Sequence, residues 1–163
     1  MDDYYVEVLS SKGVWYKVSC VLFIQYFLNI KLKMSLILKA ILLDVDKDYV
    51  IVKFDSNSPN VTKFGIQDCK LPPRQEHGLQ LKAGDDCEVL TEGKDDDPSG
   101  WWPATVKMMK GEFYVVDYKI QDETKYSDII ASDKIRCPSK SPPLSVNQFH
   151  KVVFQVPTDL HDM

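Results

Sequence analysis

An internal repeat constrains this chain more than any other feature of its sequence, although a 22-residue segment hides it. When residues 18–39 are set aside and Lys17 is joined to Ala40, the chain from 14 to 54 aligns without a gap with residues 100–118. Such self-similarity is the signature of one supersecondary unit used twice. The aligned positions are Trp15 with Trp101, Tyr16 with Trp102, Ala40 with Ala104, Tyr49 with Phe113, Val52 with Val116 and Phe54 with Tyr118.

Each copy has the pattern of short β-strands separated by polar turns. A short alternating segment opens each copy, with Glu-Val-Leu at 7–9 and again at 88–90. An aromatic-led strand, a tight turn and a strand rich in β-branched and aromatic residues follow. Repeats of about 50–60 residues built from short meandering strands are typical of small, strongly bent barrels. The sequence therefore predicts a mainly β chain with a first barrel at 1–55, a breaker-rich linker at 56–84 and a second barrel at 85–137.

The segment at 18–39 lies inside a predicted strand of the first copy and is rich in apolar residues. Residues 21–30 are almost wholly apolar, but a membrane span needs about 20 apolar residues, and a central lysine costs about 2.5–3.5 kcal/mol. Lys31, Lys33 and Lys39 interrupt the segment. A membrane span is therefore not favoured.

The position of this segment suggests a different origin. Insertions are tolerated at loop tips, where no ladder hydrogen bonds are lost, and not within strands. We interpret residues 18–39 as the translation of a retained intron of 66 nucleotides, which is 22 codons of three, with a valine codon supplying the initial GT and a lysine codon the final AG. If the residues belong to the native protein, we expect an appended amphipathic helix or a disordered loop, and a less stable first barrel.

Charge and cysteine usage narrow the functional classes. The formal net charge is −4 and only two of the twenty basic residues are arginines, whereas surfaces that bind nucleic acid directly gather lysine and arginine. The four cysteines are widely spaced and form no CxxC pair, unlike those of zinc sites or disulfide frameworks. The N-terminus is acidic and lacks the basic region of a signal peptide. We expect free thiols in the cytosol or nucleus.

No catalytic motif is present in the sequence. The three histidines lie far from any serine or cysteine in a recognisable nucleophile context. A glycine-rich phosphate loop, an HExxH motif and a spaced set of carboxylates are all missing. The sequence therefore predicts a non-enzymatic chain with no catalytic residues, no metal ligands and no cofactor.

Aromatic residues form the one constellation with a specific chemistry. Trp102 and Tyr118 begin and end two strands that should pair antiparallel, so both should lie at one rim of the second barrel. Tyr126 and Phe113 are expected near the same rim. Aromatic faces around a small pocket attract a quaternary ammonium through their quadrupoles, as in a methyl-lysine cage. The alternative is that the rings fill the barrel core. Trp101 should point to the opposite face of its strand.

The same residues carry a family resemblance. Gly-Trp-Trp-Pro-Ala-Thr-Val at 100–106 looks like the Agenet and Tudor barrel signature, and 109–115 resembles the second Tudor domain of the fragile X mental retardation protein family. Residues 68–73 and 148–160 are similar to the same family, which lacks the segment at 18–39. The resemblance implies two tandem Tudor-type (Agenet) β-barrels, followed at 145–163 by the truncated start of a KH-like element whose opening strand would be 149–156.

The resemblance also implies site residues. A methyl-lysine cage would be formed by Trp102, Tyr118, Thr124 and Tyr126, with Leu90 as an apolar wall where Tudor cages have an aromatic residue. In the first barrel, Tyr16 and Phe54 hold the equivalent positions beside the aliphatic Leu9. That barrel would serve protein contacts or pack against the second barrel.

By the same resemblance, the chain would be the methyl-lysine-reading, protein-interaction module of a cytoplasmic RNA-binding regulator of translation and mRNA transport. Such proteins work in ribonucleoprotein granules, with nuclear shuttling. Its partners would be peptides with methylated lysine or arginine, or other proteins, and RNA would bind through domains absent from this chain. Homo- or hetero-dimers with family members are also expected, and no membrane partner. The alternative is a scaffold or self-association module that binds no methyl-lysine.

Overall fold

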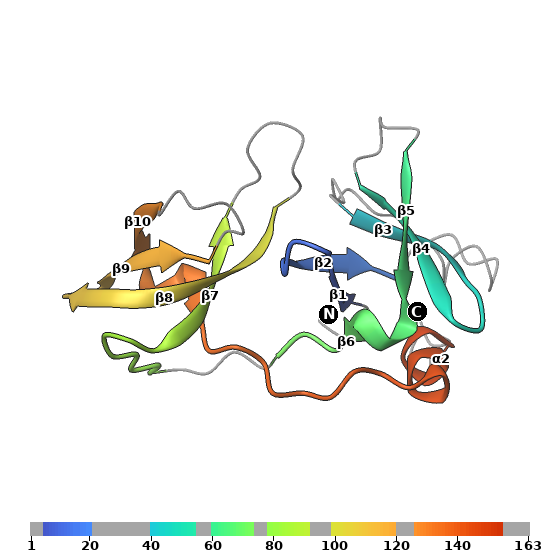
Figure 1. Ribbon diagram of the computed structural model, residues 1–163. Helices are drawn as coiled ribbons and strands as arrows, with labels where there is room; N and C mark the ends of the chain where they lie inside the picture. The colour runs from blue at the N-terminus through green and yellow to red at the C-terminus, as the bar shows by residue number, and fades with distance from the viewer. Residues whose placement is uncertain are drawn as a thin grey trace, which may run out of the picture. The chain divides into compact units, whose positions relative to one another are not determined.

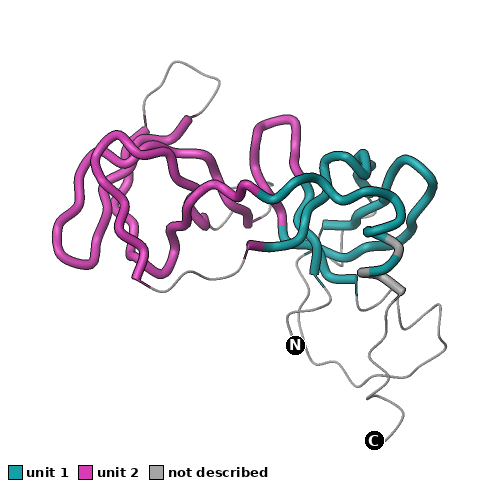
Figure 2. The backbone as a smooth tube through the Cα atoms, turned by 90° about the horizontal axis from the view of Figure 1, so that it is seen from below, with its two compact units in different colours: residues 1–8, 17–72, 141–163 teal, residues 9–16, 73–140 magenta. Residues whose placement is uncertain are grey.

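The computed structural model describes residues 5–20, 40–54, 60–73, 78–91, 99–119 and 126–154, and its elements are mainly β-strands (Figure 1). The predicted mainly β class is confirmed. The chain divides into two compact units (Figure 2). The first unit comprises Met1–Val8, Lys17–Pro72 and Ser141–Met163, and the second comprises Leu9–Tyr16 and Pro73–Lys140. Among the described helices, none has the length and apolar character needed to cross a membrane.

The second unit is a bent antiparallel meander. Its strand order is β11-β7-β8-β9-β10. The long strand β8 pairs with β7 through its first half and with β9 through its second half. A tight turn with Gly111 at φ 62° joins β8 to β9, a backbone conformation that glycine adopts without steric cost. The elements are β7 (Asp86–Thr91), β8 (Gly100–Lys110), β9 (Phe113–Tyr118), β10 (Ser127–Ala131), the 3-10 helix η2 (Ser132–Lys134) and β11 (Ile135–Arg136).

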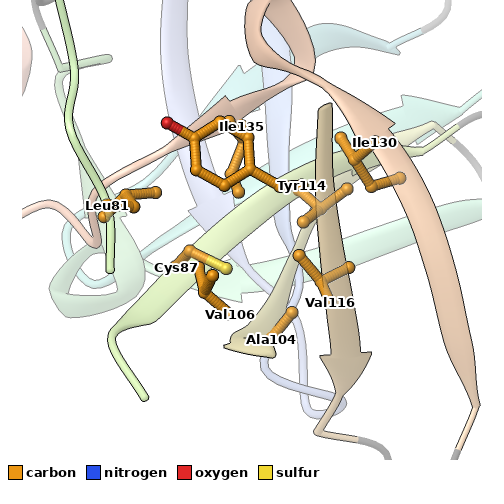
Figure 3. Packing of buried hydrophobic residues seen from close by; sticks show 9 residues of the cluster. Leu81, Cys87, Ala104, Val106, Tyr114, Val116, Ile130 and Ile135 are labelled. Atoms are coloured by element: carbon orange, nitrogen blue, oxygen red, sulfur yellow. The ribbon is translucent and has the colours of Figure 1, made fainter. Parts of the chain in front are cut away.

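Alternate residues of these strands fill the core of the second unit (Figure 3). Tyr114 and Val116 of β9 are buried, and the Tyr114 hydroxyl donates a hydrogen bond of 3.3 Å to the carbonyl oxygen of Leu79. This bond ties the segment that precedes β7 to the barrel. The buried cluster comprises Leu81, Cys87, Val89, Ala104, Val106, Tyr114, Val116, Ile130 and Ile135.

The first copy of the repeat has the same strand register as the second. Ala40 pairs with Phe54 as Ala104 pairs with Tyr118, and each ladder has a bulge directly after the pair that contains Val52 or Val116. The predicted repeat is therefore confirmed in the hydrogen-bond ladders. The elements are β1 (Tyr5–Leu9), β2 (Trp15–Ser19), β3 (Ala40–Val45), β4 (Tyr49–Phe54), β5 (Val61–Gly65), the 3-10 helix η1 (Ile66–Asp68) and β6 (Cys69–Lys70).

The first repeat extends further along the chain than the sequence predicts. The expected linker at 56–84 contains β5, which pairs with β4, and β6, which pairs with β1. Their counterparts β10 and β11 lie within the predicted second barrel. The polar residues Thr62 and Lys63, between Pro59 and Pro72, hid the β pattern of this stretch, because only a strand with one buried face shows clear alternation.

Residues 18–39 interrupt the first repeat at the point where the equivalent strand of the second repeat passes from one neighbouring strand to another. In the second unit, Ala104 and Thr105 pair with both β7 and β9, so they mark the place where β8 passes from one partner to the other. Ala40 is the counterpart of Ala104. The first repeat is divided there into β2, which pairs with β1, and β3, which pairs with β4, with one parallel bridge between Ser19 and Ile41. Each half therefore keeps its own ladder.

The sequence analysis expected an interruption within a strand to be poorly tolerated because ladder hydrogen bonds are lost there, whereas β2 and β3 both keep strand partners. Val18, Ser19 and Cys20 are described and buried at the end of β2. The helix or loop expected for the rest of the interruption falls on residues 21–39, which lie outside the described residues.

Deleting residues 18–39 should give a first repeat with a continuous strand like β8. We expect the deletion variant to keep the β-sheet circular dichroism spectrum and to be more stable by about 2–3 kcal/mol, because joining Lys17 to Ala40 removes the entropic cost of bringing together two chain ends that lie 22 residues apart. Urea denaturation of both proteins measures the difference. A variant that is less stable or unfolded would show that the segment supports the first repeat.

Each repeat contains a buried ion pair between its first and last strands. The Lys70 ammonium lies 3.8 Å from a Glu7 carboxylate oxygen, with both side chains at most 2% exposed. At the equivalent register position, the Arg136 Nε atom donates to Glu88 at 2.7 Å. Burying a charge costs several kcal/mol unless a partner compensates it. These pairs therefore restrict which residues can close each barrel.

Lys70→Met should leave the Glu7 carboxylate buried without its cation and lower the free energy of unfolding by about 3–5 kcal/mol. The double variant Glu7→Leu with Lys70→Met should recover most of that loss. The control is Lys107→Ala, which breaks an exposed ion pair of 4.0 Å with Asp117 and should cost at most about 1 kcal/mol. Urea denaturation measures all three, and equal losses in the two single variants would contradict the account.

The C-terminal described element is a helix, not the strand predicted at 149–156. Helix α2 (Val146–Phe154) begins with a capping box, in which the Gln148 amide N–H donates to the Ser145 hydroxyl and the Ser145 amide N–H donates to the Gln148 side chain. The β-branched pair Val152-Val153 favours a strand locally, whereas the capping box favours a helix that starts at this point. The Leu144 amide N–H donates to the Cys69 carbonyl oxygen at 2.8 Å, which attaches this segment to β6.

Candidate functional site

Three aromatic residues come together at one rim of the second barrel. Ala104 of β8 pairs with Tyr118 at the end of β9, and Trp102 lies two residues earlier on the same face of β8. Diagonal neighbours of this kind lie about 7–8 Å apart, within reach of aromatic side chains. The rings of Tyr118 and Tyr126 stack with centroids 5.6 Å apart and planes 29° apart. The Tyr118 amide N–H also donates to the Tyr126 carbonyl oxygen at 3.0 Å.

These rings are reachable from solvent. Tyr126 is 45% exposed, and Trp102 and Tyr118 are half-buried. Tyr114, four residues before Tyr118 on the same face of β9, is only 3% exposed. The side chain of Ala104, between the tryptophan and Tyr118, is small. The set therefore forms the open end of the core and not its interior.

Two polar atoms of this aromatic group lack a hydrogen-bond partner within the described residues. The Trp102 indole nitrogen and the Tyr118 hydroxyl oxygen are both buried. Leaving a buried donor unpaired costs about 1–3 kcal/mol. Most buried polar groups in folded proteins have a partner, so an unpaired one indicates a bound water, a ligand or a functional role. The two donors mark this rim as a candidate binding site.

The environment of Tyr118 keeps its hydroxyl protonated. Burial raises the pKa of Tyr118 to about 12, and the negative charge of Asp128 on β10 contributes in the same direction. Because this pKa lies far above neutral pH, the phenol stays neutral and retains its donor hydrogen. Asp128 was not among the residues selected from the sequence. Its position two residues after Tyr126, on the same face of an alternating strand, was the available signal.

Two residues that the sequence placed at the site lie elsewhere. Leu90 pairs with Trp101, so its side chain is on the face opposite Trp102, whose partner on β7 is the buried Val89. The family-based alignment was therefore one residue out of phase. Phe113 is at the other end of β9 and on its other face, and it is 54% exposed. Five residues of strand separate it from Tyr118 by about 16 Å.

Of the other residues named from the sequence, the structure describes Trp101 but not Thr124. Trp101 faces away from Trp102, as predicted, and the Arg136 guanidinium carbon lies 4.1 Å from the centre of its ring. This contact places Trp101 beside the buried Glu88–Arg136 ion pair. Thr124 lies outside the described residues. Within the described residues, no group of three or more histidine, cysteine, aspartate or glutamate side chains could hold a metal ion.

The equivalent positions in the first repeat do not form the same group. Tyr16 is buried, and a Cβ atom added to Gly100 would lie 2.8 Å from its ring. Phe54 packs edge-on against Phe64, with centroids 6.0 Å apart. The strand registers place Asn60 at the position of Tyr126. The first repeat therefore has no counterpart of the stacked tyrosines.

The raised pKa of Tyr118 predicts a loss of stability at alkaline pH. A folded-state pKa above the ordinary value of 10 contributes stability that is fully present below pH 10 and is lost as the pH rises toward 12. We expect the free energy of unfolding to fall more steeply over this range in the wild type than in Tyr118→Phe. Urea denaturation at several pH values measures this, and parallel curves would contradict it.

Comparison with known proteins agrees with this architecture. Residues 84–141 match the family model described as the Agenet domain. Among solved structures, "Crystal structure of ADCP1 tandem Agenet domain 3-4" is similar, with a TM-score of 0.53 and 15% sequence identity, over 83% of this chain and 78% of that chain. At this identity the similarity shows the fold alone. The chain therefore has a mainly β, Agenet/Tudor-like fold that matches a tandem Agenet structure, and the Agenet family model covers its second barrel.

Proposed function

We propose that the second barrel reads methylated lysine side chains with Trp102, Tyr118 and Tyr126 as aromatic walls. The observation that carries this proposal is the gathering of three solvent-reachable rings at one rim, where two buried donors lack partners in the described residues. The negative faces of such rings attract a methylated ammonium. Each desolvated contact is worth on the order of 2 kcal/mol.

The family match supports the same class of function. Agenet domains are generally methyl-lysine readers or protein-interaction modules. The resemblance of residues 100–115 to the fragile X proteins supports a finer proposal, in which the chain is the reader module of a cytoplasmic RNA-binding regulator of translation and mRNA transport. RNA would then bind outside this chain.

The ion pairs of its lysines argue against direct RNA binding by the second barrel. Lys119 forms an ion pair of 2.7 Å with Asp86, and Lys107 lies 4.0 Å from Asp117. Carboxylates therefore neutralise two of the cations that a phosphate-binding face would need. The net charge of −4 acts in the same direction, because phosphate binding is dominated by electrostatic attraction.

A protein-docking function is the second candidate. Met108, Val115 and Ile129 form a direct row across β8, β9 and β10. Met108 is 53% exposed and Ile129 is 67% exposed. Exposed apolar patches on soluble domains mark interaction surfaces. This row lies on the outer face of the sheet, so docking there and methyl-lysine binding at the rim do not compete.

An NMR titration of the full chain with a trimethyl-lysine peptide and a dimethyl-lysine peptide tests the reader function. We expect binding with a dissociation constant on the order of 1 mM, because cation–π contacts with three partly exposed rings, at about 1–2 kcal/mol each, supply about 4 kcal/mol in total. The largest shifts should fall on Trp102, Tyr118 and Tyr126. Tyr126→Ala should weaken binding by about tenfold.

Phe113→Ala is the matched control, because Phe113 is a similarly exposed aromatic residue of the same barrel, away from the rim. It should leave the affinity unchanged. If a folded wild-type chain shows no shifts at the rim with either peptide, the reader function is refuted and the docking function becomes the better account.

A further inference from the structure

We propose that the edge of β10, with the apolar row Met108–Val115–Ile129 beside it, binds an extended segment of a partner protein as an added strand. The segment that fits this surface has apolar side chains at alternate positions and a lysine or arginine at its C-terminal end. The inference rests on the docking function proposed above and names its class of partner. It does not involve the aromatic rim.

Strand β10 is the last strand of its sheet, and among the described strands it pairs with β9 alone (Figure 1). The Tyr118 amide N–H donates to the Tyr126 carbonyl oxygen, and the Ser132 amide N–H donates to the Glu112 carbonyl oxygen. In an antiparallel ladder, hydrogen-bonded pairs recur at every second residue between such points. The residues of β10 whose backbone N–H and C=O groups face away from β9 are therefore Ser127, Ile129 and Ala131.

The outward N–H group of Ile129 has a local partner in place of a strand. It donates a hydrogen bond of 2.8 Å to the carboxylate of the preceding residue, Asp128. A side-chain acceptor of this kind substitutes for a ladder bond. The carbonyl of an incoming strand can take its place, because peptides add to exposed sheet edges through such main-chain hydrogen bonds.

The apolar row supplies the contacts for the side chains of an added strand. Ile129 is 67% exposed and Met108 is 53% exposed, with the half-buried Val115 between them. In a strand added to β10, every second side chain lies on the outer face beside Ile129. Cross-strand pairs of apolar side chains stabilise such an arrangement. Valine, isoleucine or leucine at alternate positions of the partner therefore fits this surface.

The first repeat has charged residues at the ends of the same row. Asp44 pairs with Ile51, and Ile51 pairs with Lys63. The registers place Asp44 at the position of Met108 and Lys63 at the position of Ile129. Lysine on an edge strand opposes the addition of another strand. The fold therefore forms with a protected edge in one repeat, so the exposed isoleucine of the other is not a requirement of the architecture.

The same lysine of the first repeat also covers an aromatic ring. The Lys63 Nζ atom lies 3.7 Å from the centre of the Tyr49 ring. The counterpart of Tyr49 in the second repeat is Phe113, which pairs with Ala131 of β10 and is 54% exposed. The second repeat thus leaves both the strand edge and the neighbouring ring accessible to a partner.

The charges at the Ser127 end of the edge favour a cation at one end of the partner segment. Asp117 pairs with Ser127, and Asp128 follows it. The Asp117 carboxylate accepts a hydrogen bond from the Ser127 hydroxyl and lies 4.0 Å from Lys107 in an exposed ion pair, which contributes little. Two carboxylates beside one lysine leave this end acidic. Antiparallel pairing, the more stable kind, places the C-terminal end of the segment there.

NMR titration and amide hydrogen exchange of the full chain test the proposal with a capped peptide that alternates valine with threonine and ends in two lysines. We expect shifts on the apolar row and slower exchange of the Ser127, Ile129 and Ala131 amides, because these N–H groups gain strand partners. The same peptide with glutamates in place of the lysines should bind about threefold more weakly.

Ile129→Lys gives β10 the residue that the first repeat has at this position, so the variant should fold. It should bind the lysine peptide about tenfold more weakly, as the loss of one apolar contact provides. Val61→Lys is the matched control, because Val61 is a 53% exposed residue of β5, the edge strand of the first repeat. It should leave the affinity unchanged. Circular dichroism checks the fold of both variants.

The outcomes separate this inference from the docking function. Shifts on the apolar row without slower exchange at the edge would refute strand addition and leave the docking function standing. An absence of shifts on the row, or equal affinity in Ile129→Lys and the wild type, would refute both. Edge amides that become protected with rising protein concentration and no peptide would show that a second copy of the chain occupies the edge, and would overturn the peptide assignment.

Discussion

The hydrogen-bond ladder of β8, which serves two neighbouring strands in succession, is the constraint on which the second barrel depends. Ala104 and Thr105 pair with both β7 and β9, so the strand bends around the core at this point. The same corner places Trp102 before the bend and brings Tyr118 beside it at the rim. Because side chains alternate regularly from Trp102 through Ala104 to Val106, core and rim residues occupy one continuous face. The aromatic group is thus the open end of the core.

The repeated register explains how two copies with different sequences keep one architecture. Ala40 and Phe54 reproduce the pairing at the corner, and the buried pairs of Glu7 with Lys70 and of Glu88 with Arg136 close the two repeats at equivalent positions. Lysine and arginine both supply the positive charge that a buried carboxylate requires, so the two repeats can differ in this residue and keep the ion pair. The rim positions carry no such ion pair, so the copies differ there, and the candidate site is present in only one of the two described repeats.

The sequence predicts the parts of the fold in which pattern and pairing agree. The alignment of Trp15 with Trp101 identifies the repeated unit, and the position of Trp102 and Tyr118 at the ends of paired strands predicts the rim. The prediction for Leu90 was wrong because it came from matching positions in a family pattern. The face of the sheet on which a side chain lies depends on its cross-strand partner, and a shift of one residue places it on the opposite face. The strands at Val61–Gly65 and Cys69–Lys70 were missed because they are short and partly polar. Asp128 was missed because its relevance follows from its cross-strand partner.

Intermolecular nuclear Overhauser effects between the N-methyl protons of a bound dimethyl-lysine peptide and the aromatic protons of the chain test the central claim most directly. The account predicts contacts to the rings of Trp102, Tyr118 and Tyr126. Contacts to Phe113 or Trp101 instead, or no contact to any ring at saturating peptide, would contradict it and show that the three rings serve only the packing of the barrel.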